Sequence, residues 1–291
     1  MRFALLACVL LLVPSAWSAD AEPAAESSPS RVPLWPEGAG PQFDKAADGA
    51  GPWITVHHPD APSGTAMVIC PGGGYRGLVT EQEGHGIARW LNRHGITGVV
   101  LEYRLPRGRA AVPLADAQRA IRTVRATAEE WDVRPNRIGI IGFSAGGHLA
   151  STAATQFDDG DPAATDPIAR VSSRPDFAVL VYPVISMGEL AHTGSRTRLL
   201  GEDAPQELRQ RYSSELRVTA ATPPMFLTHA IDDKVVVIEH SRRMQAALER
   251  HGVPSRLLEL ASGGHGLNGY QGPMWDAWQT EVLKWIKQTV R

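Results

Sequence analysis

A serine flanked by glycines at residues 142–146 (GFSAG) sets the strongest constraint on how this chain can fold. The apolar run Arg137–Phe143 leads into it, and His148–Ala154 follows with the composition of a helix. A strand that turns directly into a helix is so crowded that glycines are needed on both sides of the serine. The turn lifts the Ser144 hydroxyl out of the sheet, beside the free N–H groups of the helix N-terminus. The motif predicts that Ser144 is a nucleophile; the alternative is a glycine-rich turn with an incidental serine.

Short apolar runs alternate with helical patterns along the rest of the chain, which is typical of a mostly parallel β-sheet with crossover helices. We expect strands over Trp53–His57, Thr65–Cys70, Gly98–Tyr103, Arg137–Phe143, Phe177–Tyr182, Met225–His229 and Ser255–Leu260. Helical spacing of apolar residues predicts helices over Glu83–His94, Ala115–Trp131, Val236–His251 and Trp275–Val290. About 40 residues between Val184 and Met225 interrupt this alternation.

A serine hydroxyl is a poor nucleophile near neutral pH, so Ser144 needs a base, and histidine suits that role. The chain has 10 histidines, and position must decide among them. His265 lies in a glycine-rich loop, residues 262–266, directly after the last expected strand. This is where the base of a hydrolase with the order Ser, Asp, His is placed. His229, at the end of its strand, is expected to be a buried structural histidine instead.

The imidazole of such a base must be held by a carboxylate. Asp232 and Asp233 are adjacent and both follow the strand Met225–His229. Spacing relative to Ala230 and Val236 favours Asp233 as the acid of the triad, which leaves Asp232 as a turn or capping residue.

The negative oxygen formed when an ester carbonyl is attacked needs backbone N–H donors. The N–H of Ala145 is one predicted donor, because it follows the nucleophile. The loop at residues 71–75 (PGGGY) comes directly after the strand Thr65–Cys70, and its glycines let the backbone approach a ligand closely. We therefore predict Gly73 and Gly74 as the other donors. Tyr75 is predicted to bind substrate and is considered as a third donor.

The first residues indicate export. Arg2 precedes the apolar run Phe3–Val13, and small residues follow, so residues 1–18 are predicted to be a signal peptide and the protein to be periplasmic or secreted. A lipoprotein signal ending at Cys8 is the alternative, but no apolar core precedes that cysteine. Residues 19–30 read as a disordered leader and 31–291 as one catalytic domain. No second segment is apolar enough to be a membrane anchor after cleavage.

Composition narrows the classes of partner and cofactor. The formal net charge is −2 with no basic or acidic block, which disfavours nucleic acid as the main partner. The 2 cysteines are Cys8, removed with the signal peptide, and Cys70, so the mature chain has neither an internal disulfide nor a cysteine-based metal site. We expect Cys70 to be buried and inert, and no metal or other cofactor to be required. Oligomeric state stays open.

The order Ser144, Asp233, His265 is that of the α/β-hydrolases and differs from the chymotrypsin and subtilisin orders. The chain resembles the exported bacterial serine esterases of the acetyl xylan esterase-like, or BD-FAE-like, group of that superfamily. The segments that carry the resemblance span nearly the whole mature chain: 34–38 (LWPEG), 71–75, 114–120 (LADAQRA), 142–148, 229–236 and 263–266.

The resemblance implies an α/β-hydrolase fold, with a mostly parallel eight-stranded sheet flanked by helices and an insertion after strand 6. In such folds the insertion usually shapes the substrate pocket; the other interpretation of residues 185–224 is a surface excursion. Two departures from the family pattern are Pro71, where related lipases have His, and the turn after the seventh strand. There Ala230 and Val237 stand where relatives often have Gly and Pro.

The function implied is that of a carboxylesterase that removes small acyl groups, acetyl foremost, from carbohydrate such as xylan through an acyl-enzyme. One alternative is a serine peptidase of the prolyl-oligopeptidase type, although such enzymes normally carry an N-terminal propeller for which this chain has no room. Another is a catalytically silent binding protein with the same fold, which the intact set of Ser144, Asp233 and His265 disfavours.

Overall fold

The computed structural model describes residues 29–36, 40–49 and 51–290. The predicted signal peptide and all of the predicted leader except Pro29 and Ser30 lie outside the described residues. Within the described part, no helix has both the length and the apolar character needed to cross a membrane.

The described residues form an eight-stranded sheet in the order β1-β2-β4-β3-β5-β6-β7-β8. The strands are β1 (Ser30–Pro33), β2 (Trp53–His57), β3 (Thr65–Cys70), β4 (Ile96–Glu102), β5 (Ile138–Phe143), β6 (Phe177–Val181), β7 (Met225–Ala230) and β8 (Ser255–Leu260). All pairs are parallel except those that β2 makes with β1 and β4. The mostly parallel eight-stranded sheet is confirmed, and all seven expected strands are present. The eighth strand, β1, is not among the strands expected from the sequence, and it begins at Ser30.

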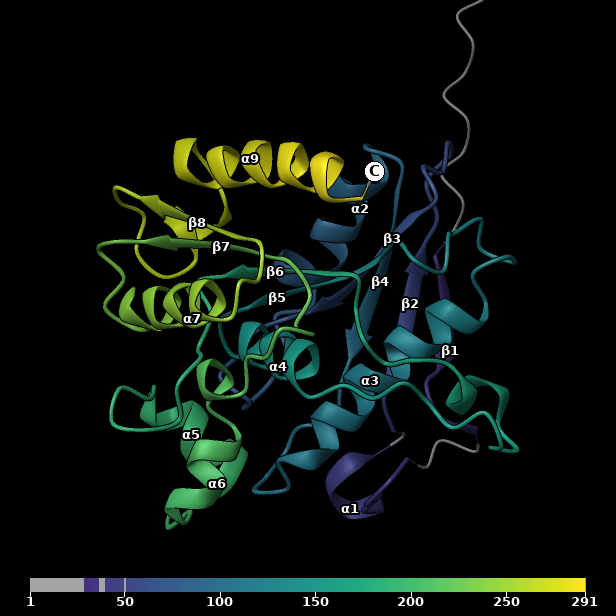
Figure 1. Ribbon diagram of the computed structural model, residues 1–291, viewed down its shortest axis with the longest axis horizontal. Coiled ribbons are helices and arrows are strands. Elements are labelled where there is room, and N and C mark those ends of the chain that lie inside the picture. Colours follow the sequence, from purple (N-terminus) through teal and green to yellow (C-terminus); the bar gives the residue numbers. More distant parts are fainter. Residues whose placement is uncertain (1–28, 37–39, 50, 291) are drawn as a thin grey trace, which may run out of the picture.

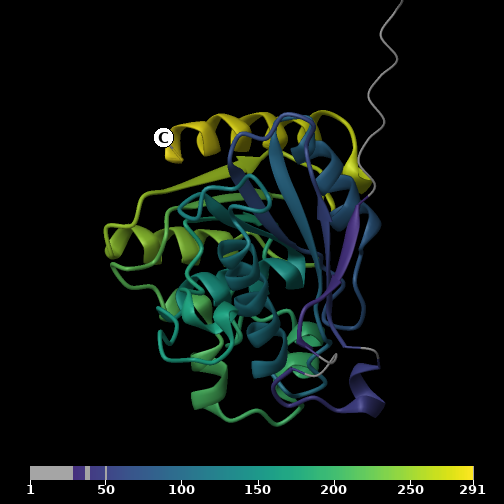
Figure 2. The same ribbon diagram turned by 90° about the vertical axis from the view of Figure 1, so that its right-hand side faces the viewer.

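Helices cover both faces of this sheet. The α-helices of the described residues are α1 (Lys45–Asp48), α2 (Gly86–Asn92), α3 (Ala111–Ala126), α4 (Ser144–Thr155), α5 (Thr193–Leu200), α6 (Gln206–Arg211), α7 (Glu239–Arg250), α8 (Leu267–Tyr270) and α9 (Pro273–Thr289). Figure 1 shows α2 and α9 on one face and α3, α4 and α7 on the other. In the view turned by 90° (Figure 2), α9, in yellow, runs along its face of the sheet.

The central strands are buried on both faces because their side chains alternate between two apolar clusters. In β3, Val68 belongs to the cluster under α3, α4 and α7, whereas Met67 and Ile69 belong to the cluster under α2 and α9. In β5, Ile140 and Ile141 divide in the same way. This explains why these strands read as continuous apolar runs in the sequence.

Two predicted helices differ from those observed. The segment predicted as a helix from Glu83 begins instead with a π-helical turn, Glu81–His85, which continues into α2. π-Helical turns are frequent at functional sites. α3 begins at Ala111, before the predicted start, and so includes Pro113. Proline, which has no backbone N–H, is tolerated there because N–H groups in the first turn of a helix have no partner within the helix.

The predicted site segments all follow the carboxyl ends of parallel strands. The glycine loop follows β3, the GFSAG turn follows β5, the two aspartates follow β7 and the histidine loop follows β8. The carboxyl ends of parallel strands meet at one edge of a sheet, which is where ligands bind in open α/β sheets. The topology thus brings together four segments that are far apart in the sequence.

Candidate active site

Three of the predicted residues form a hydrogen-bonded line at this edge. Ser144 Oγ lies 2.9 Å from His265 Nε2, and His265 Nδ1 lies 2.7 Å from Asp233 Oδ2. Because an ionised carboxylate only accepts hydrogen bonds, Nδ1 carries the proton and donates it to Asp233. Nε2 is then the unprotonated nitrogen and accepts the hydroxyl proton of Ser144. This arrangement prepares His265 to remove that proton.

The turn that presents Ser144 is held in a strained conformation. The residue has φ 52°, a region that non-glycine residues seldom occupy. A Cβ atom at Gly142 would lie 2.1 Å from the Gly146 carbonyl oxygen, and one at Gly146 would lie 2.1 Å from that of Cys70. Both glycines are therefore required by the close passage of backbone around the serine. Ser144 is 9% exposed, with α4 starting at its own position.

Asp233 is buried and its carboxylate is fully engaged. Oδ1 accepts the N–H groups of Val235 and Val236, at 2.9 and 3.0 Å. Oδ2 lies 3.3 Å from His229 Nε2 in addition to its bond with His265. Burial acts to raise the pKa of Asp233, but the hydrogen bonds from His229, His265 and Val236 outweigh it and hold the pKa well below its usual range. The acid therefore stays ionised beside the histidine.

The contacts of Asp232 and His229 distinguish them from the two residues that were predicted to be catalytic. Asp232 accepts the backbone N–H groups of Gly264 and Gly263, at 2.9 and 3.3 Å. It therefore anchors the loop that carries His265, a more specific role than the turn residue that was predicted. His229 is fully buried between Ser241 and the Val236 carbonyl, which confirms that it is a structural histidine.

The glycine loop presents backbone amides close to Ser144. The N–H of Gly72 is already used, since it donates to Glu83 Oε2 at 2.7 Å. Among the described residues, the loop and turn hydrogen bonds include none donated by Gly73 or Gly74. Ala145 lies in the first turn of α4, where N–H groups have no partner within the helix. The three predicted donors thus belong to segments whose amides are available to a ligand.

The predicted role of the Tyr75 side chain in binding substrate is wrong. The residue is 2% exposed, and its hydroxyl donates to His148 Nδ1 at 2.8 Å. His148 Nε2 in turn donates to the Tyr212 carbonyl at 2.7 Å. Tyr75 has φ 56°, which turns its side chain into the core beneath the loop. The phenol therefore supports the glycine loop from below, and only its backbone N–H remains a candidate donor.

The segment 185–224 borders the site through α5. Arg198 Nη1 donates to the Gly74 carbonyl at 3.2 Å. His192 caps α5 at its N-terminus and lies near the triad. Burial is the main cause that holds the pKa of His192 below its usual value, and the nearby His265 and Arg198 act in the same direction. Of the two interpretations of this insertion, the structure favours the one in which it shapes the site.

Sequence reasoning missed two residues beneath the site. Glu83 is 3% exposed and contacts the glycine loop, and Tyr182 packs its ring against that of His265, with centroids 4.9 Å apart. Nothing in the sequence distinguishes Glu83 from its exposed neighbour Glu81, because the way in which the turn Glu81–His85 packs beneath the glycine loop decides which of the two is buried. Tyr182 was included only as the end of a strand.

The match to a family model covers residues 56–248, a range that includes the glycine loop, Ser144 and Asp233. The chain belongs to the BD-FAE family. A solved structure of the acetyl ester-xyloside bifunctional hydrolase from Caldicellulosiruptor lactoaceticus is 41% identical in sequence, with a TM-score of 0.85, and the match covers 89% of this chain and 96% of that one. The α/β-hydrolase fold is thereby confirmed.

This BD-FAE family chain is also similar to two larger proteins. The acetylxylan esterase of Xylanibacter ruminicola is 38% identical over 213 residues, which are 72% of this chain and 42% of that protein. Endo-1,4-beta-xylanase B of Butyrivibrio fibrisolvens is 32% identical over 241 residues, 80% of this chain and 37% of that protein. The chain thus spans about two fifths of the length of these curated relatives.

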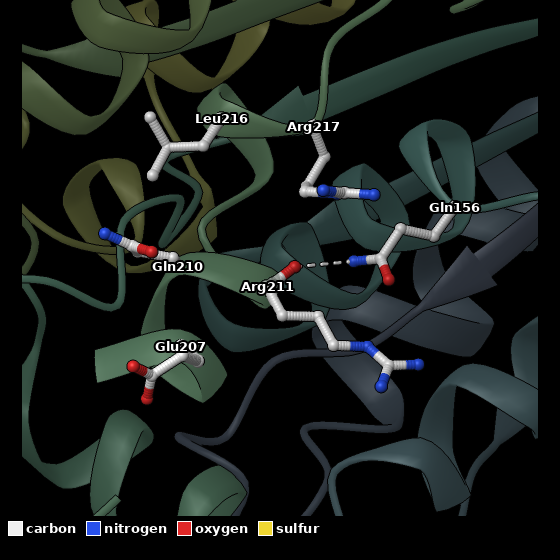
Figure 3. A pocket seen from close by; sticks show the side chains of 6 residues that line it. All are labelled: Gln156, Glu207, Gln210, Arg211, Leu216 and Arg217. Carbon is white, nitrogen blue, oxygen red and sulfur yellow. Dashed lines mark hydrogen bonds between the residues drawn. The ribbon is translucent and has the colours of Figure 1, made fainter. Parts of the chain in front are cut away.

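A separate hollow of about 540 Å³ opens at the other end of α4 (Figure 3). Its lining residues are Gln156, Glu207, Gln210, Arg211, Leu216 and Arg217. Gln156 follows the last residue of α4, whereas Ser144 is the first, and the Gln156 amide donates to the Arg211 carbonyl at 2.9 Å. None of these residues was predicted for the site, and twelve helical residues, about 18 Å, separate the hollow from the nucleophile.

Proposed function

We propose that this BD-FAE family protein is a serine carboxylesterase that removes small acyl groups, acetyl foremost, from carbohydrate such as xylan. The observation that carries the proposal is the line of hydrogen bonds from Ser144 through His265 to Asp233, beside uncommitted backbone amides. The substrate class is supported by the acetylxylan esterase and the acetyl ester-xyloside hydrolase to which the chain is similar.

Acylation begins when Ser144 Oγ attacks the ester carbonyl carbon and its proton passes to His265 Nε2. The carbonyl oxygen becomes negative, and the N–H groups of Gly73, Gly74 and Ala145 stabilise it; losing one such donor typically lowers the rate about 10²–10³-fold. Asp233 stabilises the imidazolium that forms. The bond from carbon to the sugar oxygen then breaks, and His265 gives its proton to that oxygen, so the sugar alcohol leaves.

Deacylation repeats these steps with water. His265 takes a proton from a water molecule as its oxygen attacks the acyl-enzyme, the bond to Ser144 Oγ breaks, and His265 returns the proton to the serine. Acetate is released. Apart from this water molecule, the scheme uses only side chains and backbone amides of this chain. With the signal peptide predicted at residues 1–18, we propose that the reaction takes place in the periplasm or outside the cell.

The decisive experiment compares the wild type with Ser144→Ala on acetylated xylan, p-nitrophenyl acetate, a feruloylated sugar and a peptide panel. We expect acetate release by the wild type, and a loss of about 10⁴–10⁶-fold in kcat for the variant with an unchanged circular dichroism spectrum. Undiminished turnover in Ser144→Ala would disprove the role of the serine. Peptide cleavage without ester cleavage would favour the peptidase alternative, and failure to react with a fluorophosphonate probe would favour a silent binding protein.

A further inference from the structure

Glu83 is a buried carboxylate for which the proposed chemistry has no use. It lies in the π-helical turn Glu81–His85 and is 3% exposed. None of the ion pairs formed by the described residues includes it. Burying a carboxylate without a cationic partner is unfavourable unless hydrogen bonds compensate for the lost water. Its position therefore calls for an explanation.

Three donors compensate, and each belongs to a different part of the site. The Gly72 N–H of the glycine loop donates to Oε2 at 2.7 Å. The Tyr182 hydroxyl donates to Oε1 at 2.9 Å, and the Tyr270 hydroxyl of α8 also forms a hydrogen bond with the carboxylate. Burial raises the pKa of Glu83, while the bonds from Tyr182 and Gly72 oppose that rise.

These donors connect Glu83 to the two groups that would act together with Ser144, namely the oxyanion amides and His265. Gly72 directly precedes the proposed donors Gly73 and Gly74. Tyr182 packs against the ring of His265, and α8 starts at Leu267, just after His265 in the chain. One carboxylate thus touches the segment that would hold the oxyanion and the two segments that support the base.

The contact with Gly72 leaves little room for movement. A Cβ atom at Gly72 would lie 2.6 Å from Glu83 Oε2, 2.7 Å from the Phe143 carbonyl oxygen and 3.1 Å from the Cβ of Ser144. Gly72 is therefore held between the carboxylate and the backbone of the GFSAG turn. A shift of Glu83 would move the glycine loop relative to the nucleophile.

We infer that Glu83 is a positioning residue, which fixes the distance and direction between the oxyanion amides, Ser144 and His265 by accepting hydrogen bonds from Gly72, Tyr182 and Tyr270. The inference rests on the proposed function, because it concerns the same site. Displacement of a reacting group by about 1 Å lowers a rate about 10²-fold, so the loss on removing the carboxylate is expected in kcat.

The test compares Glu83→Gln with Glu81→Gln, a matched control in the same π-helical turn. Glu81 is exposed and pairs with Arg89 on the surface. Glutamine keeps the size of Glu83 but removes its charge and one of its two acceptor atoms. We expect Glu83→Gln to lower kcat on p-nitrophenyl acetate about 10–100-fold, with KM within about threefold. Glu81→Gln should stay within about twofold of the wild type in both, as surface substitutions usually do.

Labelling of Ser144 by a fluorophosphonate separates positioning from folding. The end point counts intact sites, while the rate constant depends on the oxyanion amides, since the phosphoryl oxygen occupies their position. We expect Glu83→Gln to lower the rate constant and to reach the wild-type end point. Tyr182→Phe, which removes one hydroxyl donor and leaves the carboxylate, should show the same pattern with a smaller decrease and stands in if a Glu83 variant does not fold.

The inference is overturned if Glu83→Gln and Tyr182→Phe label at the wild-type rate, or if only the end point or the thermal midpoint falls. A wild type that labels but hydrolyses no ester would contradict the proposed function alone, because the labelling rate would still report on Glu83. Ester hydrolysis that is unchanged in Glu83→Gln would contradict the role of Glu83 alone.

Discussion

The two sides of Ser144 are built on different physical principles. On the base side, His265 and Asp233 are connected by side-chain hydrogen bonds of 2.9 and 2.7 Å. On the oxyanion side, the groups proposed to face the substrate are backbone amides of Gly73 and Gly74, which have no side chain to place them. Their positions depend on neighbours that contact the loop, Glu83 through Gly72 and Arg198 through Gly74.

This difference determines what substitution can reveal on each side. A side chain on the base side can be removed, and its chemistry is lost with it. A backbone amide cannot be removed, so the oxyanion side is accessible only by displacing the loop or by altering the residues that support it. We therefore expect large, residue-specific effects on one side and smaller, distributed effects on the other.

The largest contrast is expected within the aspartate pair. Asp233→Asn should lower kcat about 10³–10⁴-fold, because an amide favours the wrong tautomer of His265 and cannot stabilise its positive charge. Asp232→Asn keeps one acceptor for the Gly263 and Gly264 amides, so a loss below about tenfold is expected, in line with one lost hydrogen bond of about 1 kcal/mol. Steady-state kinetics on p-nitrophenyl acetate measure both, and a larger loss in Asp232→Asn would reverse the assignment.

On the oxyanion side, alanine at Gly73 and at Gly74 should differ. A Cβ at Gly73 would lie 2.3 Å from the Gly77 carbonyl oxygen, so the loop must move, and we expect kcat to fall about 10²–10³-fold. At Gly74 the nearest atom would be Arg198 Nη1 at 3.6 Å, so the penalty is mainly that of its φ of 62°, about 1–2 kcal/mol. The same kinetic assay decides; a greater loss in Gly74→Ala would contradict this account.

Acid is expected to weaken the support of the oxyanion side. His148 joins Tyr75 to the Tyr212 carbonyl. Burial lowers the pKa of His148 to about 4, although the hydrogen bond to the Tyr212 carbonyl acts to raise it. The unfolded chain, with a pKa of about 6.5, binds the proton first, so stability is lost as pH falls from about 6.5 to about 4, by roughly 3 kcal/mol. Below that range the loss is complete.

Denaturant unfolding across this pH range measures the decline, and His148→Gln should flatten it because glutamine takes up no proton. The decline should not vanish, because the pKa values of His57 and His240 are also lowered to about 4, mainly by burial. An identical slope in the variant would show that His148 does not contribute.

The smallest effect concerns Tyr75. Tyr75→Phe removes the hydroxyl bonded to His148, so the free energy of unfolding should decrease by about 1 kcal/mol. KM for p-nitrophenyl acetate should stay within about twofold, because the phenol does not reach the substrate, and matched unfolding and kinetic measurements check both. A tenfold rise in KM with unchanged stability would restore the predicted role in binding substrate.

Patterns in the sequence predicted the three residues that the structure joins by hydrogen bonds on the base side. Ser144, His265 and Asp233 each follow a strand that the sequence predicts, and their residue types are tied to the chemistry proposed for them. The glycine loop was located for the same reason. The features that the sequence did not reveal depend on tertiary contacts. β1 is a short strand that is stabilised by pairing with β2. Glu83 is buried because the helix starts with a π-helical turn. Tyr75 was misjudged because its φ of 56° is invisible in the sequence.

By itself, the sequence determined the alternation of strands and helices, the order of Ser144, Asp233 and His265, and the glycines without which the turn at Ser144 could not form. These are local properties, set by side-chain periodicity and by backbone crowding between near neighbours. Only the tertiary structure decided which acid serves the base through its side chain and which through the loop, where the Tyr75 ring points, and that Glu83 lies beneath the glycine loop. Those contacts join residues far apart in the chain, and a linear pattern carries no record of the distances that make them.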